Sequence, residues 1–148
     1  MSCAFVERSL RISEENIEVV LAIYQAWRRG DALAASGLLD PGIEWLNPDA
    51  AVDDGAHQGL DNFMATAESI TDALDDVDIE LERLIEVGND VVVVGVMRAR
   101  VRGSDTELRR RQGYVWTIRN GRAVRFQWFN NPREAFEAAG LNERDADS

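Results

Sequence analysis

Apolar positions recur with a helical period in two stretches of the first half of the chain. The first stretch follows Ser13, an N-cap residue with two glutamates behind it, and ends at Gly30, which favours a helix C-terminus. Its apolar face consists of Ile17, Val20, Leu21, Tyr24 and Trp27. The second face consists of Leu60, Phe63, Met64, Ala67, Ile70 and Leu74. This spacing predicts two amphipathic helices.

Two shorter elements are predicted between these helices. Asp31 can cap a short helix over residues 33–39, which the Asp-Pro-Gly sequence that follows would stop. The next segment, "IEWLN", has the alternation of a strand, with Ile43, Trp45 and Asn47 on one face.

The period of the pattern changes to two in the second half of the chain. Alternating segments cover residues 77–87, 91–102, 107–119 and 122–129. Short Gly-containing sequences separate them, and Asn120-Gly121 between the last two is a strong signal for a two-residue hairpin. Successive hairpins predict an antiparallel meander. A final helix is predicted over about residues 133–139, after an Asn-Asn-Pro sequence.

Helices that precede the strands, rather than alternate with them, indicate an α+β fold. We expect one domain over residues 1–148, with its core at about 14–141 and both ends frayed. The strands are long enough for the sheet to curve strongly, and the two long helices would cover its concave face. Such a cone, open at one end, predicts an apolar pocket for a small molecule.

The alternation also predicts which face of the sheet is buried. In segment 91–102, apolar residues occupy one face and Arg98, Arg100 and Arg102 occupy the other. Unpaired arginines in an apolar interior would each cost several kcal/mol, so this row should lie on the back of the sheet, beside Glu80 and Glu82. The inward faces of the last two strands would consist of Leu108, Tyr114, Trp116, Ile118, Val124, Phe126 and Trp128.

Two interpretations of the arginine row are open. Cross-strand ion pairs are the simpler one, and each would contribute less than about 1 kcal/mol. A homodimer through the polar back of the sheet is the other, and it is favoured because arginine is common at such interfaces. A sedimentation mass of 16.5 kDa, the mass of one chain, would contradict the dimer.

Charge and composition narrow the function classes. The formal net charge of −11 argues against nucleic acid or an anionic membrane surface as a partner. The chain has no lysine, which excludes Schiff-base chemistry, and its one histidine and one cysteine, Cys3, cannot form a His/Cys zinc site. We expect no cofactor and no metal, although the Asp and Glu residues are numerous enough to form a metal site from carboxylates alone. The lack of a membrane-length apolar stretch and of a signal-peptide pattern indicates a cytoplasmic protein.

Four segments follow one another along the chain: "AIYQAWRRGDALAASGLLDPGIEW", "GNDVVVVGVMRARVRGS", "YVWTIRNGRAVRFQWF" and "REAFEAAGL". In this order they resemble the SnoaL-like branch of the nuclear transport factor 2-like (NTF2-like) superfamily, over about residues 14–141. The resemblance implies a cone-shaped, cystatin-like α+β barrel that is usually dimeric. Relatives include ketosteroid isomerase, limonene epoxide hydrolase, scytalone dehydratase and polyketide cyclases. Other members bind ligands or partners without catalysis, so the fold alone assigns no reaction.

The resemblance directs attention to Asn47. The isomerase and many relatives have an aspartate general base near this point, whereas an amide cannot accept a substrate proton at neutral pH. The epoxide hydrolase uses an asparagine there to hold water, but it also needs an Asp-Arg-Asp set on its sheet. Residues 91–102 contain no carboxylate, and Gln127 stands where the second aspartate would come. Neither mechanism transfers whole, and capping of the turn before Pro48 explains Asn47 equally well.

His57 is the side chain best suited to proton transfer near neutral pH. It precedes the second long helix, and Asp53 or Asp54 could orient it. A solvated or structural role is the alternative for a histidine in a loop. Tyr24 or Tyr114 could offer a hydroxyl group to a carbonyl oxygen.

Three function hypotheses follow. The first is a metal- and cofactor-independent isomerase, cyclase or hydrolase of a cyclic or polyketide-like substrate, with His57, Asn47 and Tyr24 as candidate catalytic residues. The second is a non-catalytic domain that binds a small apolar molecule. The third is a dimerisation domain whose own aromatic side chains fill the pocket. The side chains expected to contact a ligand are Trp27, Trp45, Phe63, Met97, Tyr114, Trp116 and Trp128.

Overall fold

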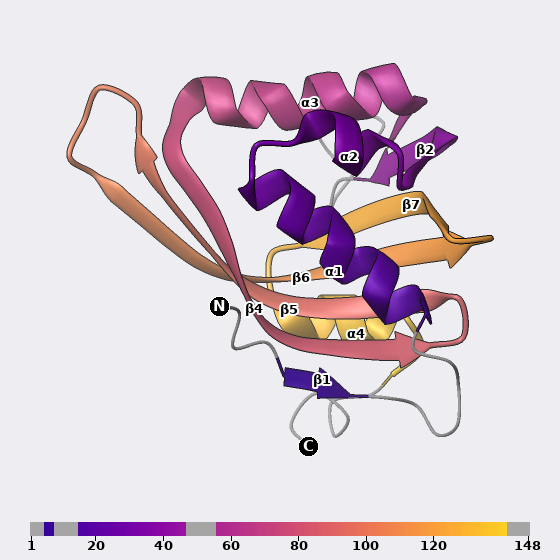
Figure 1. The fold of residues 1–148 in the computed structure, drawn as a ribbon. Coiled ribbons are helices and arrows are strands. Elements are labelled where there is room, and N and C mark those ends of the chain that lie inside the picture. The colour runs from indigo at the N-terminus through magenta and orange to yellow at the C-terminus, as the bar shows by residue number, and fades with distance from the viewer. Residues whose placement is uncertain (1–4, 8–14, 47–55, 142–148) are drawn as a thin grey trace.

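Strands dominate the structure, a computed structural model that describes residues 5–7, 15–46 and 56–141 (Figure 1). In this part of the chain, seven strands join one sheet in the order β1-β4-β5-β6-β7-β2-β3. The long central strands are β4 (Leu74–Val87), β5 (Asp90–Val101), β6 (Glu107–Arg119) and β7 (Arg122–Phe129). Each of them pairs antiparallel with the next, which confirms the predicted meander.

The two edges of the sheet differ from the prediction of a purely antiparallel arrangement. β2 (Leu39–Leu46) pairs parallel with β7, and β3 (Ala56–Gln58) then pairs antiparallel with β2. At the other edge, β1 (Phe5–Glu7) pairs parallel with β4. Phe5–Glu7 thus pair within the sheet, while Cys3 lies outside the described residues, and the expectation of frayed ends stays a prediction.

The long helices α1 (Glu15–Arg28) and α3 (Leu60–Ala73) cover the same face of the curved sheet, as predicted (Figure 1). Their buried side chains join those of the strands in one core, because the helical faces and the strand faces are both apolar. This main core includes Ile17, Val20, Ile23, Phe63, Leu84, Val91, Val93, Tyr114, Trp116 and Phe126.

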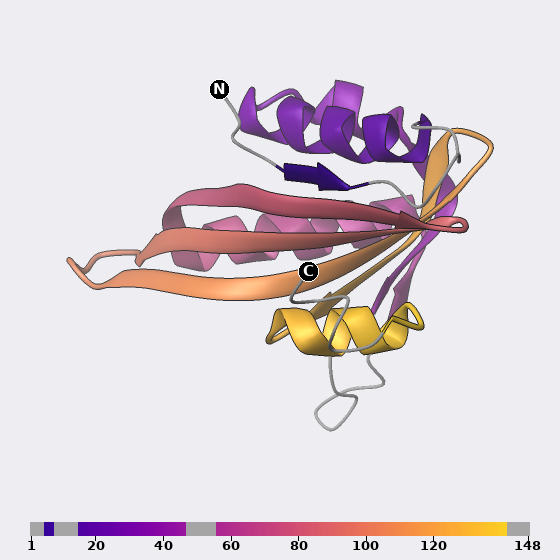
Figure 2. The same ribbon diagram turned by 90° about the horizontal axis from the view of Figure 1, so that it is seen from below.

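The last helix, α4 (Pro132–Ala138), lies on the opposite face of the sheet (Figure 2). It is an exception to the expected placement of the helices on the concave face. The reason lies in the run of four valines in β5, which is buried on both faces instead of alternating with polar residues. The second core beneath α4 consists of Ile85, Val92, Val94, Val115, Phe129, Ala135 and Phe136.

Two predicted helix ends are displaced. The helix α2 (Ala32–Ser36) ends earlier than expected, and β2 runs through the Asp-Pro-Gly sequence that was expected to form a stop. The Asp40 carboxylate accepts a hydrogen bond from the Gly42 N–H at 2.8 Å, and the register of β2 shifts here, so the turn makes a bulge within the strand. Leu74, expected on the second long helix, is the first residue of β4.

A bulge also corrects the predicted inward face of β7. Phe126 pairs with Trp116, but Ala123 rather than Val124 pairs with Ile118, because the register shifts between these pairs. Ala123 is consequently fully buried in the main core, and Val124 is turned away from it. The predicted inward positions of Phe126 and Trp128 are confirmed.

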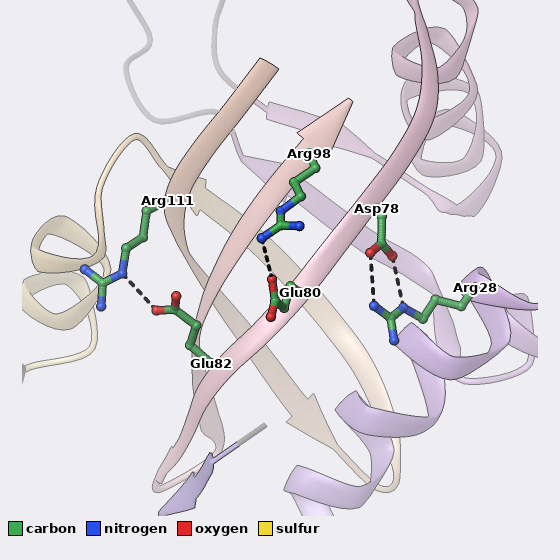
Figure 3. Close-up of polar contacts among 6 residues, drawn as sticks. All are labelled: Arg28, Asp78, Glu80, Glu82, Arg98 and Arg111. Carbon is green, nitrogen blue, oxygen red and sulfur yellow. Dashed lines mark hydrogen bonds and ion pairs between the residues drawn. The ribbon is translucent and has the colours of Figure 1, made fainter. Parts of the chain in front are cut away.

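The arginine row lies on the back of the sheet in exposed ion pairs, as predicted, and Figure 3 shows the pair that Arg98 forms. Arg98 lies 3.1 Å from Glu80, and Arg111 of the next strand lies 2.8 Å from Glu82. Arg100 and Arg102 pair with acidic side chains at the start of β4. Each such exposed pair contributes at most about 1 kcal/mol, and the homodimer stays a prediction. Among the described residues, the helices are too short or too polar to span a membrane.

Candidate functional site

A cavity of about 460 Å³ lies between α1, α3 and the curved sheet. Its volume falls in the range of about 300–1,000 Å³ that is usual for small-molecule pockets. The side chains predicted to contact a ligand all line this cavity: Trp27, Trp45, Phe63, Met97, Tyr114, Trp116 and Trp128. Tyr24, a candidate catalytic residue, lines it as well. Contact with a ligand itself stays a prediction.

The deep wall of the cavity is a cluster of aromatic rings. Phe63 of α3 lies 5.0 Å from Trp45 and 6.1 Å from Phe126, measured between ring centroids. Phe126 in turn lies 4.5 Å from Trp116 and in a stacked orientation to Tyr114. Edge-to-face contacts at these distances stabilise the cluster beyond simple burial of area. The wall is therefore apolar and suited to flat rings.

Two tyrosine hydroxyl groups add polarity to this wall. Trp116 Nε1 donates a hydrogen bond to Tyr24 Oη at 3.1 Å, and Tyr114 Oη donates one to Gln112 Oε1 at 2.7 Å. Burial raises the pKa of both tyrosines well above the ordinary value of 10.0, and the neighbouring Tyr114 raises the pKa of Tyr24 further. Both phenols are therefore neutral at physiological pH. They can donate or accept a hydrogen bond, but they do not serve as bases.

Charged side chains stand at the rim of the cavity. Arg28 at the end of α1 forms a two-pronged hydrogen bond with Asp78 of β4, at 3.0 and 3.1 Å (Figure 3). Arg110 and Gln112 of β6 also line the cavity, and the sequence analysis did not single them out. The signal was present, because both share the period-two face of Leu108 and Tyr114.

A second hollow of about 510 Å³ is lined mainly by polar side chains of β2, β6 and β7. Its polar groups already satisfy one another in two places. Thr117 donates a hydrogen bond to Asp90 at 2.7 Å, and Arg125 lies 3.3 Å from Glu44. The aromatic cavity is therefore the stronger candidate for a binding site.

Sequence comparison identifies the family. The profile of the SnoaL-like domain matches residues 20–126. The chain belongs to the SnoaL-like domain family. This confirms the resemblance that the ordered motifs indicated. No curated protein matches the chain.

Solved structures share the fold of this SnoaL-like domain. An NTF2-like protein of unknown function from Burkholderia pseudomallei is 25% identical, with a TM-score of 0.71 over 85% of this chain and 97% of that chain. A protein described as a SnoaL-like polyketide cyclase, from Jannaschia sp. CCS1, is 16% identical, with a TM-score of 0.72 over 83% and 90%. TerC, co-crystallised with polyporic acid, is 23% identical, with a TM-score of 0.69 over 85% and 98%.

Of the other two candidate catalytic residues of the SnoaL-like domain, His57 lies within the described residues and Asn47 does not. Asn47 lies outside the described residues, as do Asp53 and Asp54, so neither interpretation of Asn47 is tested. The backbone of His57 lies in β3, in register with Trp45 of the cavity wall. Within residues 5–7, 15–46 and 56–141, no three His, Cys, Asp or Glu side chains are grouped as metal ligands.

Proposed function

We propose that this SnoaL-like domain binds a small apolar molecule that contains a ring, without a metal or cofactor. The observation that carries the proposal is the cavity of about 460 Å³ with its aromatic wall. Buried aromatic side chains supply a large contact area at low entropic cost, and the neutral hydroxyl of Tyr24 can fix the orientation of a polar group. Co-crystallisation of the structurally similar TerC with polyporic acid supports an organic ligand.

Fluorescence provides a direct test, because all four tryptophans of the chain line the cavity. We expect the neutral dye N-phenylnaphthylamine to bind saturably, with a rise in its own emission and energy transfer from the tryptophans. Ala67 lines the cavity, so Ala67→Phe should fill space and weaken binding at least about tenfold. Ala138→Phe, on the exposed side of α4, is the matched control and should bind normally. A lack of saturable binding to the native protein would refute the proposal.

The volume of the cavity also argues against one of the three function hypotheses, the pure dimerisation domain. A pure dimerisation domain was expected to fill the pocket with its own aromatic side chains, and an open volume of about 460 Å³ disfavours that hypothesis. A homodimer through the exposed Arg–acid pairs on the back of the sheet remains compatible with ligand binding, because those pairs lie on the face opposite the main core. We keep this homodimer and a cytoplasmic location as part of the proposal, with no nucleic acid or membrane partner.

Catalysis on the bound molecule is a second candidate function, and the contact between Tyr24 and Trp116 favours it. The indole N–H fixes the Tyr24 oxygen, and the phenol keeps its own proton to donate to a carbonyl or epoxide oxygen of a substrate. His57 would then serve as acid or base, and Asn47 as a further hydrogen-bond partner. The reaction would be an isomerisation, cyclisation or hydrolysis of a cyclic or polyketide-like substrate. A non-catalytic ligand-binding domain is the alternative.

A screen of cyclic ketones, epoxides and polyketide-like esters separates these two functions. For any substrate that turns over, Tyr24→Phe should lower kcat by about a hundredfold with little change in dye binding. His57→Ala should lower kcat by about a hundredfold or more. Because burial raises the pKa of Tyr24, kcat should not increase as pH approaches 10.0. Rates equal to the uncatalysed background in every class would leave ligand binding as the function.

A further inference from the structure

Strand β6 contributes two polar side chains, Arg110 and Gln112, to the lining of the cavity. Alternate side chains of this strand line the cavity, from Leu108 through Arg110 and Gln112 to Tyr114 and Trp116. Met97 of β5 is the cross-strand partner of Arg110 and lines the cavity too. Because residues directly opposite each other in an antiparallel pair share a face, the Arg110 side chain belongs to the cavity face of the sheet.

The charges at this rim do not cancel. Arg28 and Asp78 neutralise each other through their two-pronged contact. Arg110 makes no ion pair or hydrogen bond within the part of the chain that the structure describes. The cavity rim therefore carries one net positive charge, on a protein whose formal net charge is −11. A cation set against an apolar wall attracts anions more strongly than a cation on an open surface.

Gln112 provides a second donor beside this charge. Its Oε1 accepts the hydrogen bond from Tyr114, which leaves the side-chain N–H groups to donate. Gln112 is only 8% exposed, so a hydrogen bond to this amide would be shielded from water. Residues two apart on one strand face lie about 6–7 Å from each other, within reach of one carboxylate between Arg110 and Gln112. The rim of the cavity thus offers hydrogen-bond donors and a positive charge, while the aromatic wall offers a surface for rings.

We propose that the cavity selects apolar ring compounds that carry a carboxylate, with the rings against the aromatic wall and the carboxylate held by Arg110 and Gln112. This inference rests on the proposed function, since it names the class of ligand for the same cavity. It also assigns Arg110 as a specificity-determining residue. Arginine suits the task, because its planar guanidinium group can bind both oxygens of a carboxylate at once.

Displacement of N-phenylnaphthylamine by two matched competitors tests the inference. Naphthoate and naphthamide have the same rings and nearly the same shape, and they differ in charge. We expect naphthoate to displace the dye from the native protein with an affinity about fivefold higher than naphthamide, the upper end of what an exposed ion pair supports. The preference should fall as salt concentration rises.

Variants on the two faces of β6 identify the residue responsible. Arg110→Gln should bring the ratio of naphthoate to naphthamide affinity to about one, because it removes the positive charge that distinguishes the two competitors, and Arg110→Lys should keep part of the preference. Arg109→Gln is the matched control, because Arg109 is exposed, lies one residue away and pairs in register with Arg98 of the back row. This control should keep the full preference.

The outcomes separate the inference from the function on which it rests. Dye binding without a preference for naphthoate, or with a preference that survives in Arg110→Gln, would overturn the carboxylate inference alone. Loss of the preference in Arg109→Gln as well would also overturn it, since the effect would then come from overall charge. Failure of the native protein to bind the neutral dye would remove the proposed function and the inference together.

Discussion

Replacing Phe63 by alanine is expected to lower the free energy of unfolding by about 3–5 kcal/mol. The Phe63 ring is 1% exposed and stands at the centre of the aromatic cluster, between Trp45 and Trp116. Its removal loses the burial of the ring and leaves a cavity, because the surrounding side chains relax only partially. Unfolding in urea, followed by tryptophan fluorescence and by circular dichroism, measures the change.

Two comparison variants show whether the loss comes from packing at this position. Phe63→Leu keeps most of the volume and should cost less than about 1.5 kcal/mol. Leu33→Ala removes a large apolar side chain that is 84% exposed on α2, and its effect should stay within about 0.5 kcal/mol. If Phe63→Ala cost no more than Leu33→Ala, α3 would not be packed against the sheet through this ring.

Periodicity predicted the part of the fold that contains Phe63, because the side of an element that a residue occupies depends only on the local backbone. The period of 3.6 placed Tyr24 and Phe63 on buried helical faces. The period of two placed Tyr114 and Trp116 on the buried face of a strand. These faces, taken together, predicted the composition of the cavity wall.

The same argument failed where an extra residue interrupts a strand. In β7, a register shift exchanged the places of Ala123 and Val124. In β2, a hydrogen bond from the Gly42 N–H to the Asp40 side chain turned an expected stop into a bulge. A bulge inverts the alternation on one side of itself, and no simple count of apolar positions reveals it.

The sequence predicted the residues at the rim of the cavity less well than those of its aromatic wall. Arg110 and Gln112 have the right alternation, but an expectation of apolar lining passes over polar residues. The contact between Arg28 and Asp78 joins residues that are 50 positions apart, and it depends on how α1 crosses β4. Local pattern carries no information about such a contact, so the charge balance at the rim emerged only from the structure.

Replacing Gly113 by alanine is expected to destabilise the fold by about 1–3 kcal/mol, through a clash with α4. A Cβ atom at this position of β6 would lie 2.6 Å from the Ala135 Cβ and 3.0 Å from the Pro132 Cα. Neither neighbour is the end of a flexible side chain, so α4 would have to move away from the sheet. A glycine inside a strand often marks such a close approach, and here it permits the second core to form.

A double-mutant cycle with Ala135→Gly tests whether this clash is the cause. Alone, Ala135→Gly should cost about 1 kcal/mol, the usual penalty for glycine in a helix. In the Gly113→Ala background it removes the nearest obstructing atom, the Ala135 Cβ, so the combined loss should be smaller than the sum by about 1 kcal/mol. Gly37→Ala is the control, because its φ of −67° and contacts of 3.5 Å or longer suit alanine. Additive losses in the cycle would show that α4 does not rest on Gly113, and the second core would then need a different packing.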